Sequence, residues 1–251
     1  MGKTGTDVAK NAADMILADD NFVTIEKAVK NGRHIYENIK KAVHFLLATN
    51  IGEIAVIFFG LLLGWETPLL AIQLLWINLV TDSLPAIALG MEPADKEIMS
   101  KKPQNSKKSL FADGLGGKIF IEGTMIGILT LLAFSIGIKM YGLTVARTMA
   151  FTALSILELI HSINVKTDKS IFTIGLFNNW YLLVAIVSGI ILQVFVTAVP
   201  VFSKIFQVTN LNVNQWLIVG IISIMPIILT EIQKKINEIS YGKTIYIKEV
   251  N

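Results

Sequence analysis

Apolar residues in this chain gather in long runs and do not alternate with polar ones. A run of about 20 apolar residues is long enough to cross the roughly 30 Å hydrocarbon layer of a membrane. Six such runs occur, at 43–64, 69–91, 119–140, 147–165, 179–200 and 215–232. The sixth is short and contains Pro226. The pattern predicts an all-α membrane protein whose six-helix transmembrane bundle occupies residues 43–233.

The segment 24–42, ahead of the first run, has an amphipathic pattern instead. Its apolar residues recur at helical spacing with charged residues between them, namely Ile25, Ala28, Val29, Ile35, Tyr36 and Ile39. No proline separates this segment from the first run, so we predict one continuous helix over about 24–63. Such a helix is about 60 Å long, twice what the membrane needs. It is either a stalk that transmits force from a soluble domain or an ordinary helix lying on the membrane surface.

Composition agrees with a membrane location. Of the 251 residues 53% are hydrophobic and 16% are charged, against about a quarter charged in an average soluble domain. The net charge of +3 is small and dispersed, so we expect lipid and no nucleic acid as a partner. The absence of cysteine excludes disulfides and thiolate metal ligands.

The basic residues alternate from one connection to the next. They are plentiful at Lys27, Lys30, Arg33, Lys40 and Lys41, at Lys96, Lys101, Lys102, Lys107 and Lys108, at Lys166 and Lys169, and at Lys234, Lys235, Lys243 and Lys248. Residues 65–68 have none and 201–214 have only Lys204. Basic residues mark the cytoplasmic side of short loops, so both termini are predicted to be cytoplasmic, with the cell membrane as the location.

Polar and ionisable residues occur inside three of the predicted spans. Such residues are costly in lipid and usually face the bundle interior or an ion pathway. The set comprises three carboxylates, two amides and a hydroxyl: Asn50, Glu53, Asn78, Thr81, Asp82 and Glu158. Spacings of three and four residues place those of the first span, and those of the second, on one helix face each.

Pro85 adds a free acceptor to this set. Proline has no N–H, so the carbonyl of Thr81 lacks its helical donor, and lipid supplies no other. Hard cations such as Ca²⁺ take six to eight oxygen ligands from carboxylates, amides, carbonyls and water. The residues therefore predict a cation or proton site, since three carboxylates on matched faces exceed what interhelical hydrogen bonding requires.

Four further polar residues lie in or near the spans. We expect His44 and His161 to be structural. Glu122, near one end of the third span, is expected at the membrane interface, and Glu231 at the end of the sixth span.

Several motifs resemble the P-type cation-transporting ATPases, nearest to the calcium pumps of the sarcoplasmic reticulum type. They are TGTDVAKNAADMILADDNF, NIGE, LLWINLVTDSLPAIALG and EPADKEIM, with ILE in the fourth span and LNVNQWL before the sixth. The resemblance covers essentially the whole chain. It implies a C-terminal fragment with the last six of ten membrane helices. Residues 1–23 would then be a remnant of the α/β phosphorylation domain, 24–42 a cytoplasmic stalk and 234–251 a cytoplasmic tail.

The resemblance also implies ligand roles. Asn50, Glu53, Thr81, Asp82 and Glu158 correspond to one Ca²⁺ site, and Asn78 and Asp82 to part of a second. Ser83 departs from the pattern, because the family usually has glycine there.

The motifs of the phosphorylated aspartate, the nucleotide-binding domain and the actuator domain are missing from the sequence. No catalytic residue is therefore expected in this chain, and ATP and Mg²⁺ belong to an intact parent. The missing domains would be joined in cis or supplied by a separate chain.

The implied function is the cation-binding part of an ATP-driven pump that exports Ca²⁺ from the cytoplasm with proton countertransport. One alternative is a pump for Mn²⁺, Na⁺, K⁺ or H⁺. Another is a non-enzymatic six-helix membrane module or a truncated remnant. An antiporter is disfavoured, because the fifth and sixth spans carry no carboxylate at mid-depth.

Overall fold

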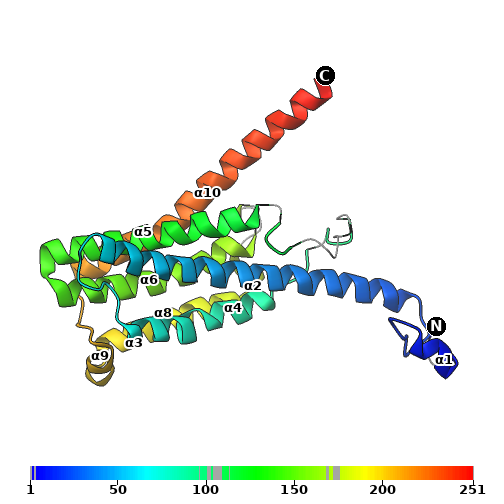
Figure 1. The fold of residues 1–251 in the computed structure, drawn as a ribbon, viewed down its shortest axis with the longest axis horizontal. Coiled ribbons are helices and arrows are strands. Elements are labelled where there is room, and N and C mark those ends of the chain that lie inside the picture. Colours follow the sequence, from blue (N-terminus) through cyan, green and yellow to red (C-terminus); the bar gives the residue numbers. More distant parts are fainter. Residues whose placement is uncertain are drawn as a thin grey trace.

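The chain is a bundle of long helices with two helical extensions (Figure 1). The computed structural model describes residues 2, 4–95, 97–100, 103, 109–112, 114–167, 170–171 and 176–250, and for 237–250 the backbone only. The elements are α1 (Asp7–Asn11), α2 (Val23–Leu62), α3 (Ala71–Trp76), η1 (Ile77–Thr81), α4 (Ser83–Gly90), α5 (Leu115–Tyr141), α6 (Leu143–Lys166), η2 (Leu176–Asn178), α8 (Trp180–Ala198), α9 (Pro200–Phe206) and α10 (Val213–Val250).

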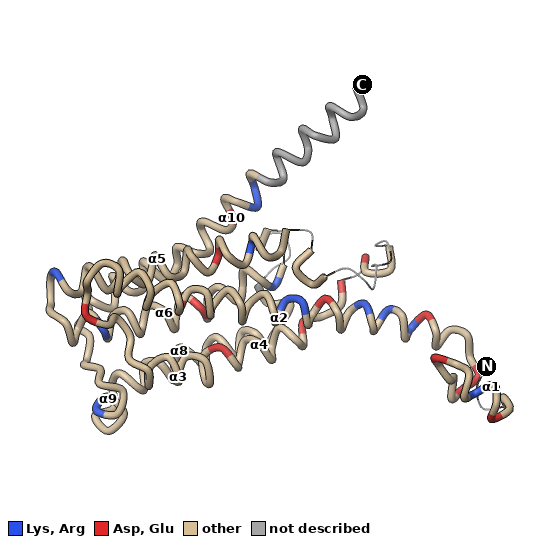
Figure 2. Tube along the Cα trace, in the orientation of Figure 1, with Lys and Arg blue, Asp and Glu red and all other residues tan. Residues whose placement is uncertain are grey.

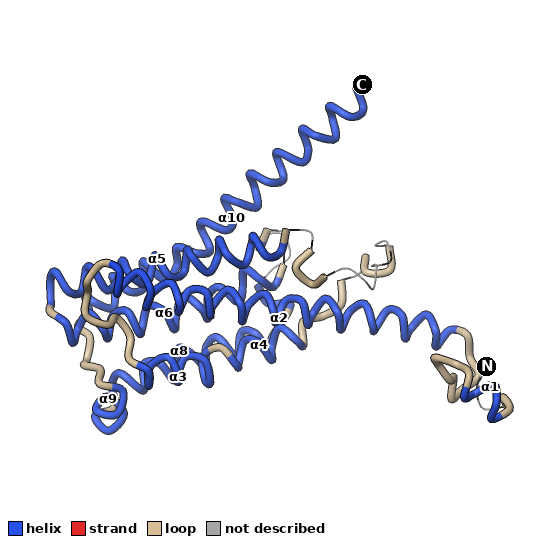
Figure 3. The backbone as a smooth tube through the Cα atoms, in the orientation of Figure 1, coloured by secondary structure: helices blue, strands red, loops and turns tan. Residues whose placement is uncertain are grey.

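Six of the described helical segments are long and apolar enough to cross a membrane. Each corresponds to one of the predicted runs, and the second comprises α3, η1 and α4 together. The described residues contain no strand, only one isolated bridge between Gly2 and Leu17 (Figure 3). The predicted all-α membrane bundle is therefore confirmed.

Helix α2 confirms the continuous helix predicted from the amphipathic segment. It runs unbroken for 40 residues, and its first half projects beyond the bundle (Figure 1). Acidic and basic residues are concentrated on this projecting half and are sparse along the bundle (Figure 2). Whether this half is a stalk or a helix lying on the membrane surface stays a prediction.

The second span is broken by a π-helical turn, η1. The amide of Asp82 donates to the carbonyl of Ile77, five residues earlier, at 2.9 Å. The wider turn lies just ahead of Pro85, whose ring crowds the preceding turn of an α-helix. The second span therefore stays helical through its interruption.

Helix α10 passes through Pro226 and continues to Val250, whereas the sixth candidate span within it is Val213–Ile236. Between the fifth and sixth spans, α9 adds a short helix where only a loop was expected. The predicted loop residues Lys96, Lys101, Lys102, Lys107, Lys108 and Lys169 lie outside the described residues. Lys166 is the last residue of α6 and is buried, with its Nζ 3.8 Å from Glu92 Oε1.

Helices α2 and α5 approach closely through glycines. A Cβ atom at Gly123 would lie 2.5 Å from the carbonyl oxygen of Ala48, and one at Gly127 would lie 2.7 Å from Ala55 Cβ. Small residues four apart permit this backbone approach in membrane helices. The contact sets the position of the α2 segment that carries the predicted ligands.

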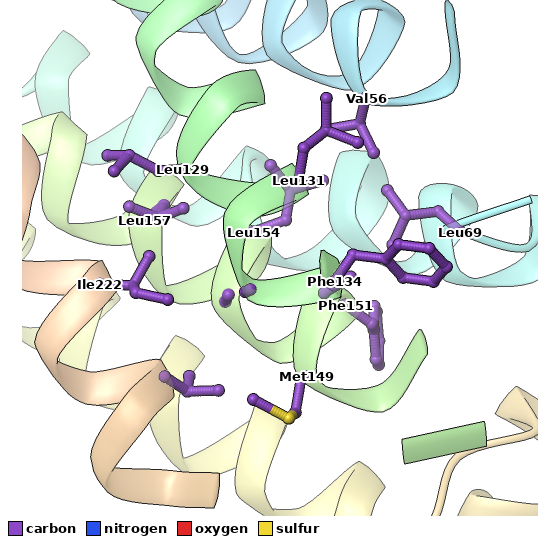
Figure 4. Close-up of a cluster of buried hydrophobic side chains, with 14 of the residues drawn as sticks. Val56, Leu69, Leu129, Leu131, Phe134, Met149, Phe151, Leu154, Leu157 and Ile222 are labelled. Atoms are coloured by element: carbon purple, nitrogen blue, oxygen red, sulfur yellow. The ribbon is translucent and has the colours of Figure 1, made fainter. Parts of the chain in front are cut away.

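The apolar core lies beside that segment and is shared by α2, α5, α6 and α10. Figure 4 shows Val56, Leu131, Leu154 and Ile222 converging from these four helices. Helix α6 is the central element, with most of its residues buried. Its carboxylate at Glu158 is therefore held inside the bundle, away from lipid.

Candidate cation-binding site

Three buried carboxylates come together from α2, α6 and the junction of η1 with α4. The exposed fraction is 7% for Glu53 and zero for Asp82 and Glu158. Glu158 interacts electrostatically with both of the others. Three acids in one low-dielectric region repel each other when ionised, so the arrangement needs cations or protons to be stable.

Asn78 and Glu53 form the most direct contact of the site. The side-chain amide nitrogen of Asn78 donates to Glu53 Oε1 at 2.7 Å and to Oε2 at 2.8 Å. The side chain of Asn78 is otherwise exposed. The contact therefore joins a buried acid to an exposed amide.

Asp82 is held by a residue that the sequence reasoning missed. Thr49 Oγ1 donates to Asp82 Oδ2 at 2.8 Å, and both side chains are fully buried. Thr49 lies four residues before Glu53, on the same helix face. That spacing could have indicated Thr49 as a residue of the site. Threonine hydroxyls in membrane helices usually bond to the backbone of their own helix, however, so a threonine alone does not indicate a site.

Three carboxylate oxygens of this site have no hydrogen-bond donor among the described residues. They are Asp82 Oδ1 and both oxygens of Glu158, and all are buried. An unsatisfied buried acceptor costs about 1–3 kcal/mol, more when it is charged. These oxygens have the chemistry to bind a hard cation or protons.

Two of the predicted ligands are turned into their own helices. The amide nitrogen of Asn50 donates to the carbonyl of Leu46 at 2.6 Å. Thr81 Oγ1 donates to the carbonyl of Ile77 at 2.9 Å. The structure thus gathers Glu53, Asn78, Asp82 and Glu158 but does not draw Asn50 and Thr81 into side-chain contacts with them, and their role as ligands stays a prediction.

Ser83, the departure from the family pattern, has a defined contact. Its hydroxyl donates to the carbonyl oxygen of Asn78 at 3.2 Å, across the π turn. A glycine could not make this bond. The amide of Asp82, which would bond to the Asn78 carbonyl in an α-helix, donates to Ile77 instead. The hydroxyl of Ser83 therefore gives the Asn78 carbonyl a donor.

Glu122, which was expected at the membrane interface, is enclosed by protein, and its depth in the membrane stays a prediction. Its exposed fraction is 2%, because His44 of α2 and His161 of α6 enclose it. Glu122 Oε2 lies 2.5 Å from His44 Nε2 and 3.5 Å from His161 Nε2. Glu231, at the far end of the sixth apolar run, accepts from Ser170 Oγ at 2.5 Å.

Comparison with known proteins gives a consistent result. Residues 66–236 match the family model described as cation transporting ATPase, C-terminus. The chain is 46% identical to calcium-transporting ATPase 1 of Bacillus cereus over 93% of its own length and 28% of that protein. Identity is 44% to the calcium-transporting ATPase of Bacillus subtilis, over 91% of the chain and 26% of that protein.

A mammalian relative is more distant. The match to calcium-transporting ATPase type 2C member 1 of Mus musculus has 37% identity over 94% of the chain and 26% of that protein. The chain therefore spans about a quarter of the length of the curated relatives it matches.

Proposed function

Because the chain belongs to the family of cation-transporting ATPases, whose C-terminal part it matches, we propose that it is the ion-binding membrane part of an ATP-driven Ca²⁺ pump. The observation that carries the proposal is the set of three buried carboxylates with three oxygens that lack donors. The names of the relatives support Ca²⁺ as the transported ion. An all-oxygen donor set suits that ion.

Ion binding requires a rearrangement at Asn78. Its amide nitrogen now holds Glu53, and only its oxygen can ligate a cation. Rotation of the amide would release Glu53 toward Asp82 and Glu158 and present the oxygen to the ion. Asn50 and Thr81 would complete the site by giving up their backbone contacts.

The exposed face of the second span at Asn78 fits a part of a longer protein. A polar side chain facing lipid is costly, so we infer that a helix from elsewhere in the pump covers this face and supplies further ligands. The phosphorylated aspartate, the ATP and the Mg²⁺ also belong to that remainder. Helix α2, which extends far beyond the bundle, would carry movement of the soluble domains to Glu53.

Protons are the natural counter-ions of this cycle. When Ca²⁺ leaves, three neighbouring carboxylates in a low-dielectric region cannot all stay ionised. We therefore propose that protons replace the ion and are carried in the opposite direction. The cation and the protons would be bound alternately by the same oxygens, which couples their movements.

The test uses the full-length pump that contains this chain, purified and supplied with ATP at a series of Ca²⁺ concentrations. The variant Asp82→Asn should lose Ca²⁺-dependent phosphorylation, and Glu158→Gln should behave similarly. The loss should be at least the roughly 10–100-fold that follows removal of an outer-shell partner. Glu66→Gln is the matched control, because the side chain of Glu66 is 70% exposed and lies outside the carboxylate site.

Undiminished phosphorylation of Asp82→Asn at low Ca²⁺ would reject the site. Repeating the titration with Mn²⁺, Na⁺ and K⁺ identifies the transported ion, since the phosphorylation of the wild type should rise at the lowest concentration for that ion.

The proposed orientation places both termini in the cytoplasm of a cell whose plasma membrane holds the pump. The chain has no cysteine, so single cysteines can be introduced cleanly. Given a cysteine-free background in the remainder, a membrane-impermeant maleimide added to intact cells should label Glu66→Cys but not Thr6→Cys. Labelling in the reverse pattern would invert the orientation.

A further inference from the structure

A second cluster of polar side chains lies one helical turn from the carboxylate site. It consists of His44 on α2, Glu122 on α5 and His161 on α6, and all three are buried. One ligand atom from each lies within 4.8 Å of the other two. The cluster therefore draws one side chain from each of three helices.

His161 is not accounted for by a purely structural role. Its exposed fraction is zero, and neither ring nitrogen has a hydrogen-bond partner among the described residues. Its Nε2 points toward the carboxylate of Glu122 at 3.5 Å, beyond ordinary hydrogen-bond length. A neutral imidazole carries one N–H donor and one acceptor, and leaving both unmet inside a bundle is costly.

From this geometry we propose that His44, Glu122 and His161 form a binding site for a divalent transition-metal ion such as Zn²⁺ or Co²⁺. Two imidazoles and one carboxylate are a common three-residue ligand set for zinc, with water at the fourth position. Bonds of about 2.0–2.1 Å in a tetrahedral site place the ligand atoms roughly 3.3 Å apart. The observed separations bracket this value, so small side-chain rotations admit the ion.

The chemistry separates this site from the proposed Ca²⁺ site. Imidazole favours Zn²⁺, Co²⁺ and related ions, whereas Ca²⁺ prefers oxygen. The charges of Lys118 on α5 and Lys234 on α10 also act on His161. These positive charges repel a cation that is held by electrostatic attraction alone. The ion must therefore form strong coordination bonds to the imidazole nitrogens of His44 and His161. Phe45, stacked on His161 with ring centroids 6.4 Å apart, holds the imidazole in position.

An ion at this site would restrain α2 relative to α6. His161 lies one turn after Glu158 on α6, and His44 lies nine residues before Glu53 on α2. The proposed pump cycle requires these two helices to shift. Bound metal should therefore slow transport without entering the Ca²⁺ site.

The experiment measures Co²⁺ binding to the purified, metal-free full-length protein by its visible absorption. Wild type should show the bands of a tetrahedral Co²⁺ complex, and Zn²⁺ should displace them. His44→Gln and His161→Gln should each lose this signal. His34→Gln is the matched control, because His34 is the third histidine of the chain and lies on the projecting part of α2.

Three outcomes would overturn the proposal: no tetrahedral Co²⁺ signal in the wild type, an unchanged signal in His161→Gln, or loss of the signal in His34→Gln. Each variant is first checked by size-exclusion chromatography. If the buried variants do not fold, X-ray absorption of the zinc-loaded wild type decides. Outer-shell scattering from two imidazoles supports the site, and an all-oxygen shell rejects it.

The proposal does not depend on the transported ion. The Asp82→Asn protein should keep the Co²⁺ signal even though it loses Ca²⁺-dependent phosphorylation. Failure of one proposal is thereby distinguished from failure of the other.

Discussion

Thr49 Oγ1 donates a 2.8 Å hydrogen bond to Asp82 Oδ2 and so links α2 to the residue that follows the π turn. The same hydroxyl lies 3.0 Å from the carbonyl oxygen of Leu46. With one oxygen of Asp82 held by Thr49, the other is the oxygen without a donor. Thr49 therefore determines which side of the carboxylate is available to an ion.

The first prediction concerns this positioning role. Thr49→Val keeps the shape of the side chain but removes the hydroxyl, so Asp82 loses its orienting donor. Loss of an outer-shell partner typically costs about 10–100-fold in metal affinity. The Ca²⁺ concentration for half-maximal phosphorylation of the full-length pump should rise by about that factor, and Thr49→Ser should restore it.

Thr130→Val serves as the control, because Thr130 is equally buried but donates to the carbonyl of Ile126 in its own helix. An equal shift in both valine variants would mean that Thr49 acts through helix stability and not through Asp82.

The second prediction concerns Ser83. Ser83→Ala removes the hydrogen bond to the Asn78 carbonyl and should lower the free energy of unfolding by about 0.5–1.5 kcal/mol. Ca²⁺ affinity should change little, since the hydroxyl is not among the proposed ligands. Thermal unfolding and Ca²⁺ titration measure the two effects. Ser203→Ala, in α9, is the control for removal of a hydroxyl that bonds only locally. A large loss of Ca²⁺ affinity with unchanged stability would instead make Ser83 a ligand.

The sequence was sufficient to predict the six spans and the length of α2. Both follow from local properties, namely the apolar runs and the absence of proline between Thr24 and Leu63. The pairing of Asn50 with Glu53 on one face likewise follows from helical spacing alone. The π turn could not be predicted, because Pro85 indicates only that the helix is disturbed. It does not indicate whether the helix unwinds or forms a wider turn.

The buried cluster around Glu122 could not be predicted from local pattern. Glu122 stands near the start of its apolar run, where an acid usually reaches water. Its burial depends on how α5 packs between His44 and His161, which are 117 residues apart in sequence. Thr49 was missed for a related reason, since its partner Asp82 lies on another helix. Contacts of this kind depend on the tertiary packing of helices.

The third prediction concerns the start of α2. Asp19 Oδ2 accepts from Thr24 Oγ1 at 2.6 Å, and this hydrogen bond holds the pKa of Asp19 below its ordinary value. A lowered pKa means that the contact stabilises the folded form above the unfolded pKa of about 4. The stabilisation is lost as the pH falls through the lower, folded pKa.

The hydrogen-exchange protection factor of the first turn of α2, which is the intrinsic exchange rate divided by the observed rate, should therefore fall on acidification below about pH 4. Asp19→Asn should weaken this pH dependence, whereas Asp14→Asn, on the exposed segment before it, should leave it unchanged. Identical pH profiles for Asp19→Asn and the wild type would show that another group controls the start of the helix.

The last prediction concerns the contact between α2 and α5. In Gly127→Ala the new methyl group would lie 2.7 Å from Ala55 Cβ and 3.1 Å from the carbonyl oxygen of Gly52. The helices must separate to relieve the clash, which costs about 1–3 kcal/mol. Gly117→Ala is the control on the same helix, because no atom lies within 4 Å of its new Cβ and alanine favours helix by up to about 1 kcal/mol.

Thermal unfolding should therefore show a lower midpoint for Gly127→Ala and an equal or higher one for Gly117→Ala. Because Glu53 follows Gly52 directly on α2, separation of the helices should also weaken Ca²⁺ binding in the first variant alone. If Gly127→Ala were as stable as the wild type, α2 and α5 would be packed less closely than the structure shows, and the placement of Glu53 would need another support.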